Sequence, residues 1–290
     1  MQLFKSKIKD LVLVAIFATL LILGTEFDFR FSDSIYSIAD GRNWFDFFVA
    51  AIAKMPAYFV TMYACVSLFV VSLDKQNIGE KFVTLFIYCL GALISGMLMF
   101  EDIAEIFLHG IAKYAVAFAI GLILVGYLFY MLRQRNKEDI LLYKKEYLVL
   151  IISIAIIVVL TFAIKEVMER ARFIEVIQRE GTMTPWYKRG TGGDSMPSGH
   201  TAIACALFAA IPFFKKIDLF KGRNYLYYPV IGVFTLCVAL SRISMGMHFM
   251  SDVAVAGIVA FCVSKAVTWI LLGFNEDKLE IKEGSLLSKL

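Results

Sequence analysis

Apolar runs of about 20 residues recur along this chain, and they limit its possible folds more than any other feature. A segment of that length crosses the hydrocarbon core of a bilayer as an α-helix, which satisfies all of its own backbone hydrogen bonds. Hydrophobic residues make up 60% of the 290 residues and charged residues only 19%, a balance that excludes an ordinary water-soluble domain. The sequence therefore predicts an all-α, polytopic transmembrane helical bundle, with residues 1–290 forming a single integral-membrane domain.

The apolar runs predict about eight membrane crossings. We expect helices near 10–26, 47–73, 81–100, 111–132, 147–165, 199–214, 226–243 and 251–272. Lysines precede the first run and no small-residue cleavage pattern follows it, so we expect an uncleaved first helix. The polar stretch 273–290 is expected to be a cytoplasmic tail.

The distribution of positive charge predicts which side each connection faces. More than half of the 29 Lys and Arg residues fall in segments that eight crossings place on one side, namely 1–9, 74–81, 133–146, 215–225 and 273–290. By the positive-inside rule that side is cytoplasmic, and both termini lie there. The opposite, external side then receives 27–46, 101–110, 166–198 and 244–250.

The net charge of +4 is small, and no nucleic-acid partner is expected. The five cysteines lie inside apolar runs without C-x-x-C spacing, which indicates small core residues. No metal site and no cofactor are expected.

Three polar stretches interrupt the apolar pattern, and the first contains Lys165 and Arg172. Seven residues are two helical turns to within about 20°, so these side chains share a face if the helix continues. Positive charge at the end of a membrane helix is also explained by a side chain that reaches the interface.

The second stretch is Met196-Pro-Ser-Gly-His-Thr201, directly before an apolar run. A helix N-terminus offers free backbone N–H groups and the positive end of the helix dipole to an anion. Ser198 adds a hydroxyl donor, Gly199 permits close approach of the backbone, and His200 is expected at the rim. An ordinary Ser-capped helix beside an uninvolved histidine is the alternative.

The third stretch is Ser241-Arg-Ile-Ser-Met-Gly-Met-His-Phe-Met-Ser-Asp252. His248 and Asp252 are four residues apart, so on a helix the carboxylate can hold one imidazole nitrogen and leave the other available as a nucleophile. Arg242 adds a planar cation suited to phosphate oxygens. All three stretches are expected at the external membrane boundary.

Together, Lys165-x6-Arg172, Pro197-Ser-Gly-His200 and Ser241-Arg242-x5-His248-x3-Asp252 resemble the three-part signature of the type 2 phosphatidic acid phosphatase superfamily. The resemblance covers residues 165–252, within a predicted catalytic part at 147–272. It implies a six-helix core, to which this chain adds two helices. Phe173 departs from the signature, which usually has proline at that position.

The resemblance also implies roles for these residues. His248 attacks phosphorus and becomes phosphohistidine, Asp252 orients it, and His200 protonates the leaving oxygen and then activates water. The phosphate oxygens are held by Lys165, Arg172, Ser198, Gly199, Ser241 and Arg242. Three fixed cations can neutralise the spread charge of phosphoryl transfer, so activity without a metal ion is expected.

The expected substrate is a lipid phosphomonoester or diphosphate, hydrolysed at the external face of a bacterial inner membrane. Residues 27–33, with Ile35, Tyr36 and Gly41 after them, resemble the segment that follows the first helix in bacterial family members acting on lipid A, which favours a lipid A 1-phosphatase. Undecaprenyl diphosphate and phosphatidylglycerol phosphate are alternative substrates, and a lipid phosphotransferase is an alternative reaction. A transporter or lipid-binding protein would use the charges without chemistry.

Overall fold

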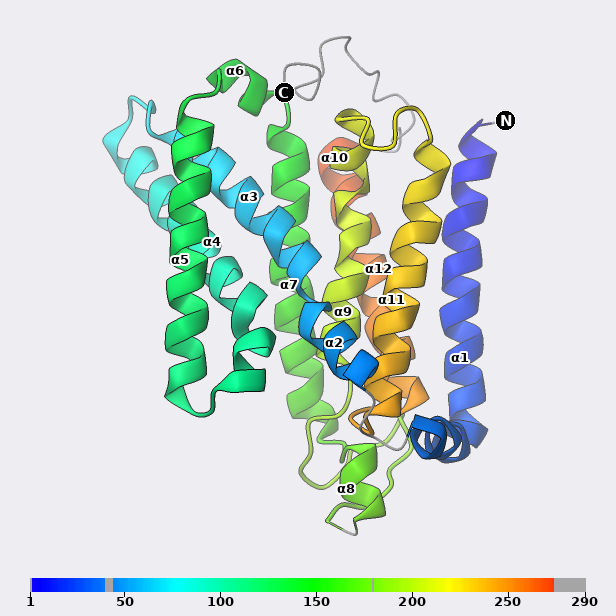
Figure 1. Cartoon of the computed structure of the whole chain (residues 1–290). Coiled ribbons are helices and arrows are strands. Elements are labelled where there is room, and N and C mark those ends of the chain that lie inside the picture. Colours follow the sequence, from blue (N-terminus) through cyan, green and yellow to red (C-terminus); the bar gives the residue numbers. More distant parts are fainter. Residues whose placement is uncertain (1, 40–43, 179, 274–290) are drawn as a thin grey trace. The chain divides into compact units, whose positions relative to one another are not determined.

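The structure, a computed structural model, describes residues 2–39, 44–178 and 180–273, with side chains from Asp10 onward (Figure 1). Every regular element within these residues is a helix, so the predicted all-α class is confirmed. The long helices are α1 (Gln2–Ala39), α3 (Met55–Ser72), α4 (Ile78–Phe107), α5 (Ile111–Arg133), α7 (Lys144–Met168), α11 (Tyr227–Ser244) and α12 (Met250–Leu272). The short ones are α2 (Trp44–Ile52), α6 (Lys137–Leu141), α8 (Phe173–Ile177), α9 (Gly199–Cys205), η1 (Ala206–Ala210), α10 (Ile211–Lys216) and η2 (Asn224–Leu226).

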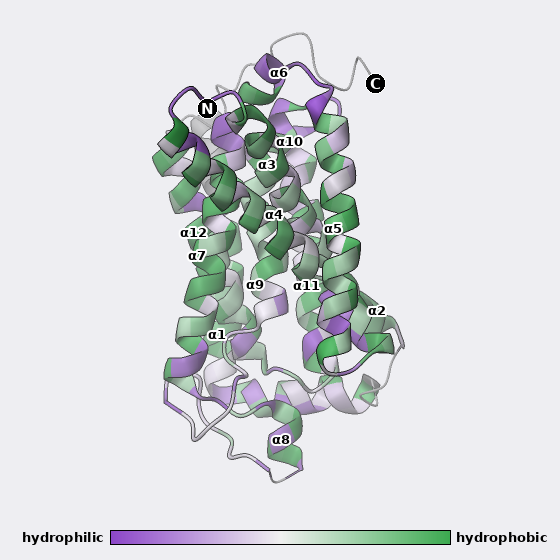
Figure 2. Cartoon of the chain, turned by 90° about the vertical axis from the view of Figure 1, so that its left-hand side faces the viewer, coloured by the Kyte–Doolittle hydropathy of each residue, from purple (hydrophilic) through white to green (hydrophobic). Residues whose placement is uncertain are grey.

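Seven helical stretches of the described chain are long and apolar enough to cross a membrane, which confirms a polytopic membrane protein. Figure 2 shows hydrophobic residues along the helices and hydrophilic residues gathered near helix ends. Large apolar side chains such as Leu11, Phe82 and Ile123 are exposed along these helices, as expected for surfaces that face lipid. Cys65 and Cys205 are buried as expected, whereas Cys89, Cys237 and Cys262 are exposed and are not core residues.

The eighth predicted crossing, 199–214, is helical but forms α9, η1 and α10 in succession. Pro212 lies in the first turn of α10 and has no N–H to donate to the preceding turn. The chain tightens into a 3₁₀ turn just before this proline. The continuity of this crossing was therefore predicted wrongly.

The first helix was predicted to end near residue 26, but α1 continues to Ala39, and α2 begins at Trp44 within the segment 27–46 that is expected on the external side. The polar residues of this segment are accommodated on α1, where Asp28 is buried against partners from distant parts of the chain. Residues 274–290 of the predicted tail lie outside the described residues.

The chain forms two compact units, each assembled from segments that are distant in the sequence. The first unit is Met1–Ala53, Ala155–Phe208 and Tyr225–Lys265; the second is Lys54–Ile154, Ala209–Asn224 and Ala266–Leu290. In the second unit α3, α4 and α5 pack against one another, and in the first α11 packs against α1, α2 and α9. Every residue predicted to form the site belongs to the first unit, which draws on more of the chain than 147–272.

Candidate active site

The loop at residues 190–195 packs against the C-terminal end of α7 and hydrogen-bonds to residues 168–170. The amide of Gly190 donates to the carbonyl of Met168 at 2.7 Å, that of Gly193 to Glu169 at 3.0 Å and that of Ser195 to Arg170 at 2.8 Å. These bonds satisfy carbonyls left free where the helix stops. A Cβ on Gly193 would lie 2.3 Å from the carbonyl oxygen of Arg170, so only glycine permits this approach. The loop thereby fixes Asp194 and Ser195 beside the end of α7.

Lys165 and Arg172 are brought together by Asp194. Arg172 donates to both carboxylate oxygens, from Nε at 2.8 Å and from Nη2 at 2.9 Å. Lys165 Nζ lies 3.9 Å from Oδ2 and also donates to the backbone oxygen of Asp194. The hydrogen bonds from Arg172, and next the charge of Lys165, hold the pKa of Asp194 below its ordinary range.

Lys165 and Arg172 do not share the face of one helix, because the helix does not continue to Arg172 and α7 ends at Met168. Glu169 has a positive φ of 43°, after which the chain is irregular until α8 begins at Phe173. Phe173 is fully buried, with ring centroids 5.4 Å from Phe29, 5.5 Å from Tyr36 and 5.6 Å from Phe249. The residue that departs from the family signature is thus an aromatic core residue of the first unit.

Asp252 lies in the first turn of α12, which begins at Met250, and His248 lies two residues before this helix. Asp252 Oδ2 accepts hydrogen bonds from the amide of Phe249 at 2.8 Å and from the hydroxyl of Ser195 at 2.6 Å. His248 Nδ1 lies 3.9 Å from Asp252 Oδ2 and 3.5 Å from Ser195 Oγ. The hydroxyl of Ser195 therefore lies nearer to this ring nitrogen than the carboxylate of Asp252 does. Asp252 is linked to the imidazole through this hydroxyl, which contacts both side chains.

The surroundings of His248 keep its ring neutral. Burial lowers the pKa of His248 well below its ordinary value, and the charges of Arg242, Lys165, His200 and Arg172 lower it further. These four side chains are therefore close enough to act on the imidazole of His248. A buried neutral imidazole keeps a lone pair available for attack near pH 7.

The hydroxyls predicted to hold phosphate are used within the protein. Ser198 is the N-cap residue of α9, and its hydroxyl accepts a hydrogen bond from Thr201 Oγ1 at 3.0 Å. Its amide donates to the carbonyl of Asp252 at 3.2 Å, which joins the start of α9, and with it Gly199, to the start of α12. Ser241 donates to the carbonyl of Val238 at 2.8 Å on its own helix, so its hydroxyl is not directed to the other site residues.

Sequence reasoning missed four residues of this cluster, Asp28, Arg170, Asp194 and Ser195. Arg170 and Ser195 lie within or next to the predicted stretches, but nothing in their spacing distinguishes them from neighbouring polar residues. Asp28 accepts a hydrogen bond at 2.7 Å from Arg170, which is 142 residues away, so no local pattern could have paired them. In the described part of the chain no three His, Cys, Asp or Glu side chains are grouped so that they could hold a metal ion.

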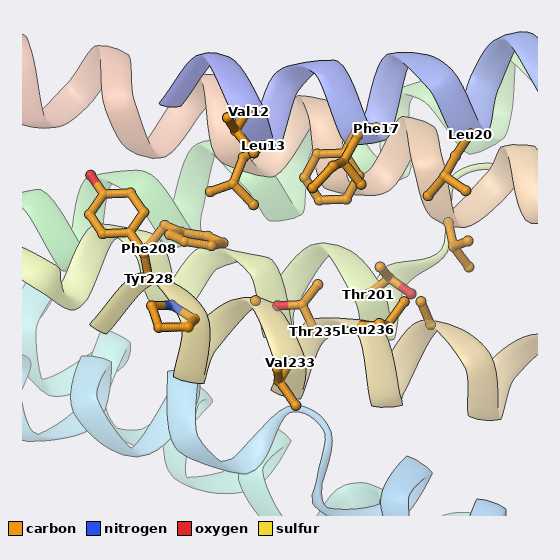
Figure 3. A pocket seen from close by; sticks show the side chains of 15 residues that line it. Val12, Leu13, Phe17, Leu20, Thr201, Phe208, Tyr228, Val233, Thr235 and Leu236 are labelled. Carbon is orange, nitrogen blue, oxygen red and sulfur yellow. The ribbon is translucent and has the colours of Figure 1, made fainter. Parts of the chain in front are cut away.

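An apolar cavity of about 430 Å³ lies in the same unit (Figure 3). Figure 3 shows Leu13 and Phe17 of α1 facing Leu236 of α11 across it. Its lining on α11 extends from Tyr228 to Ala239, about 16 Å along the axis at about 1.5 Å per residue. Thr201 and Val253 also line it, and they directly follow His200 and Asp252 in the chain.

Comparisons with known proteins match part of the chain. Phosphatidylglycerophosphatase B of Bacillus subtilis (strain 168) is 29% identical over 84 residues, which are 28% of this chain and 39% of the relative. The match thus spans less than half the length of that relative. No solved structure matches the chain. A model of the PAP2 superfamily matches residues 146–276. This segment, which carries His200, His248 and the cations around them, therefore belongs to the PAP2 superfamily.

Proposed function

We propose that this protein is a membrane phosphatase that hydrolyses a lipid phosphate through a phosphohistidine on His248. The observation that carries the proposal is the burial of the His248 imidazole near the charges of Arg242, Lys165 and Arg172 and near His200, which lower its pKa. A neutral nucleophile among fixed cations suits attack on an anionic phosphate, since phosphoryl transfer depends on positioning and on charge neutralisation. Membership of residues 146–276 in the PAP2 superfamily supports the same reaction.

The reaction has two steps. His248 Nε2, on the side of the ring away from Ser195, attacks phosphorus; the bond from phosphorus to the lipid oxygen breaks, and His200 gives that oxygen a proton. Water then attacks phosphorus and gives a proton to His200, the phosphorus–nitrogen bond breaks, and inorganic phosphate leaves. Lys165, Arg172 and Arg242 hold the phosphate oxygens with Ser198 and the Gly199 amide, and Asp252 supports the charge on His248.

The test is release of inorganic phosphate by the purified protein in detergent, in excess chelator, from lipid phosphates and diphosphates. We expect turnover by the native chain in excess chelator, because three protein cations replace a metal ion. We expect no turnover by His248→Ala, because this variant lacks the nucleophile. Hydrolysis by the His248→Ala variant at the native rate would refute the assigned nucleophile. Binding of lipid phosphate without release would favour a transporter or lipid-binding protein.

The apolar cavity favours a lipid over a water-soluble ester. It is elongated, lined mostly by apolar side chains and begins beside the residues that follow His200 and Asp252, so a hydrocarbon chain fits it. Leu236→Trp should fill the cavity and lower kcat/KM for a long-chain lipid phosphate, while a small soluble ester is hydrolysed as before. Val230→Trp, on the same helix at an exposed position outside the lining, is the matched control.

Among lipids, phosphatidylglycerol phosphate is the first to test, because the relative from Bacillus subtilis is named a phosphatidylglycerophosphatase. The case for a lipid A 1-phosphatase rested on residues 27–33 with Ile35, Tyr36 and Gly41. In the first unit Asp28 binds Arg170 while Phe29 and Tyr36 pack on Phe173. These contacts explain the three residues by their structural role, so they do not favour lipid A over other lipid substrates. Lipid A and undecaprenyl diphosphate complete the panel, and added lipid alcohols report any phosphotransferase activity.

We also propose that the site faces the outside of a bacterial inner membrane and that both termini are cytoplasmic. The positively charged connections at 74–81, 133–146 and 215–225 support this orientation.

A further inference from the structure

Arg170 is a fully buried cation that the proposed reaction does not use. Its side chain is 0% exposed, and its guanidinium carbon lies 4.2 Å from the ring centroid of Phe249. Nε donates to the carbonyl of Thr184 at 2.8 Å, and Nη1 donates to the hydroxyl of Ser251 at 2.7 Å. A guanidinium in such a place is retained only when carboxylates neutralise it.

Two buried carboxylates share the charge of Arg170. Nη1 lies 2.6 Å from Asp252 Oδ1, and Nη2 lies 2.7 Å from Asp28 Oδ2. The two oxygens of Asp252 thus have separate partners: Oδ1 is held by Arg170, and Oδ2 faces Ser195, the Phe249 amide and His248. The contact with Arg170 therefore fixes the rotation of the carboxylate that supports the nucleophile.

Asp28 also fixes the backbone beside Asp252. Its Oδ1 accepts a hydrogen bond from the amide of Ser251 at 2.8 Å, and its Oδ2 accepts one from the Ser251 hydroxyl. Ser251 is the second residue of α12 and directly precedes Asp252. Asp28 lies on α1, far outside the segment 146–276 that matches the PAP2 superfamily.

We propose that Asp28 and Arg170 are positioning residues for Asp252, so that a helix outside the family segment completes the active site. The inference rests on the proposed function, because it concerns the efficiency of attack by His248. Neither residue contacts phosphate: Arg170 sets the orientation of Asp252, and Asp28 neutralises Arg170 while it anchors the first turn of α12. The binding of phosphate by Lys165, Arg172 and Arg242 does not depend on them.

The test is Asp28→Asn, which keeps the size of the side chain and removes its charge. We expect kcat to fall about 10- to 100-fold, the scale on which a misplacement of about 1 Å costs rate, with KM within about twofold. Asp33→Asn is the matched control, since it makes the same change at an exposed position on the same helix. Folding is checked by the elution profile and by thermal unfolding in detergent.

Two further variants separate positioning from a general loss of structure. If Asp28 acts through Arg170, the double variant Asp28→Asn/Arg170→Gln loses no more kcat than Arg170→Gln alone. Ser251→Ala, which keeps the Ser251 amide bond to Asp28, should lower kcat by about two- to fivefold at unchanged KM, since it removes one neutral hydrogen-bonding partner of the pair. If Asp28→Asn or Arg170→Gln does not fold, Ser251→Ala still tests the proposal.

Equal kcat in Asp28→Asn, Ser251→Ala and the native chain, or a rise in KM alone, overturns the proposal. A native chain that releases no phosphate contradicts the proposed function instead.

Discussion

At the scale of single residues, the central group is His248, which is buried where most histidines are half exposed. Its pKa is lowered first by burial and then by neighbouring positive charge, so the imidazole stays neutral at pH values where a free histidine takes up a proton. The unfolded chain binds that proton at a higher pH than the folded one does. Protonation of the unfolded state therefore costs stability as the pH falls below about 6.5, the ordinary histidine value.

This pKa can be measured directly, because the chain has only 3 histidines. In NMR spectra of the protein labelled on histidine, the resonance that disappears in His248→Ala should show no titration near pH 6.5 and should shift only in more acidic buffer. A His248 resonance that titrates at or above about pH 6.5, the ordinary value, would contradict the description of a buried, neutral nucleophile.

Asp194 belongs to the same site, and its carboxylate binds Lys165 and Arg172, two of the cations proposed to hold phosphate. The carboxylate therefore competes with phosphate for these cations. We expect Asp194→Asn to lower KM, and the inhibition constant of inorganic phosphate, by about two- to fivefold. This range corresponds to about 0.5–1 kcal/mol, the scale of a partly exposed ion pair, since the Asp194 side chain is 56% exposed. Steady-state kinetics at constant ionic strength provide the measurement.

Glu180→Gln, which removes an exposed carboxylate from the same connection, should leave both constants unchanged. A rise in KM on Asp194→Asn would mean that this carboxylate holds Arg172 and Lys165 in place for the substrate and does not compete with it.

At the scale of helices, the sequence predicted most elements, because length and apolar content determine which segments cross a bilayer. Its errors have local causes: Pro212 divides the crossing that begins at Gly199, and the first helix was predicted to end near residue 26, where polar residues begin, although α1 continues to Ala39. The partner that buries Asp28 is Arg170, 142 residues away, and no local pattern reports a contact of that kind. The three signature stretches contain most residues of the polar cluster. Ser195 and Asp194 join the cluster because the loop at residues 190–195 hydrogen-bonds to the end of α7, and the sequence does not report these bonds.

The element α8 provides a stability prediction at Phe173. This ring is 0% exposed and contacts three other aromatic rings, so Phe173→Ala should lower the free energy of unfolding by about 3–5 kcal/mol. Reversible unfolding in mixed detergent micelles gives the measurement. Phe162→Ala on α7, where the ring is 64% exposed, should change it by less than about 0.5 kcal/mol. Equal effects of the two substitutions would contradict the aromatic core described for the first unit.

At the scale of the whole molecule, the proposed reaction requires a fixed orientation in the membrane. The positive-inside pattern predicts that Lys188 is external and Lys144 cytoplasmic. In a cysteine-free background, a membrane-impermeant thiol reagent applied to intact cells should label Lys188→Cys and not Lys144→Cys. Permeabilised cells should label both, because both positions are exposed. The reverse pattern in intact cells would place the site on the cytoplasmic face.

The measurement that tests the central claim most directly is capture of the covalent intermediate. The protein is mixed with a lipid phosphate labelled on phosphorus, quenched within the first turnover in alkali and digested into peptides. We predict a label that is stable to base and lost in acid, on the peptide that contains His248, and absent from His248→Ala. Rapid turnover of native protein with no label on that peptide, or with the label on His200, would contradict it.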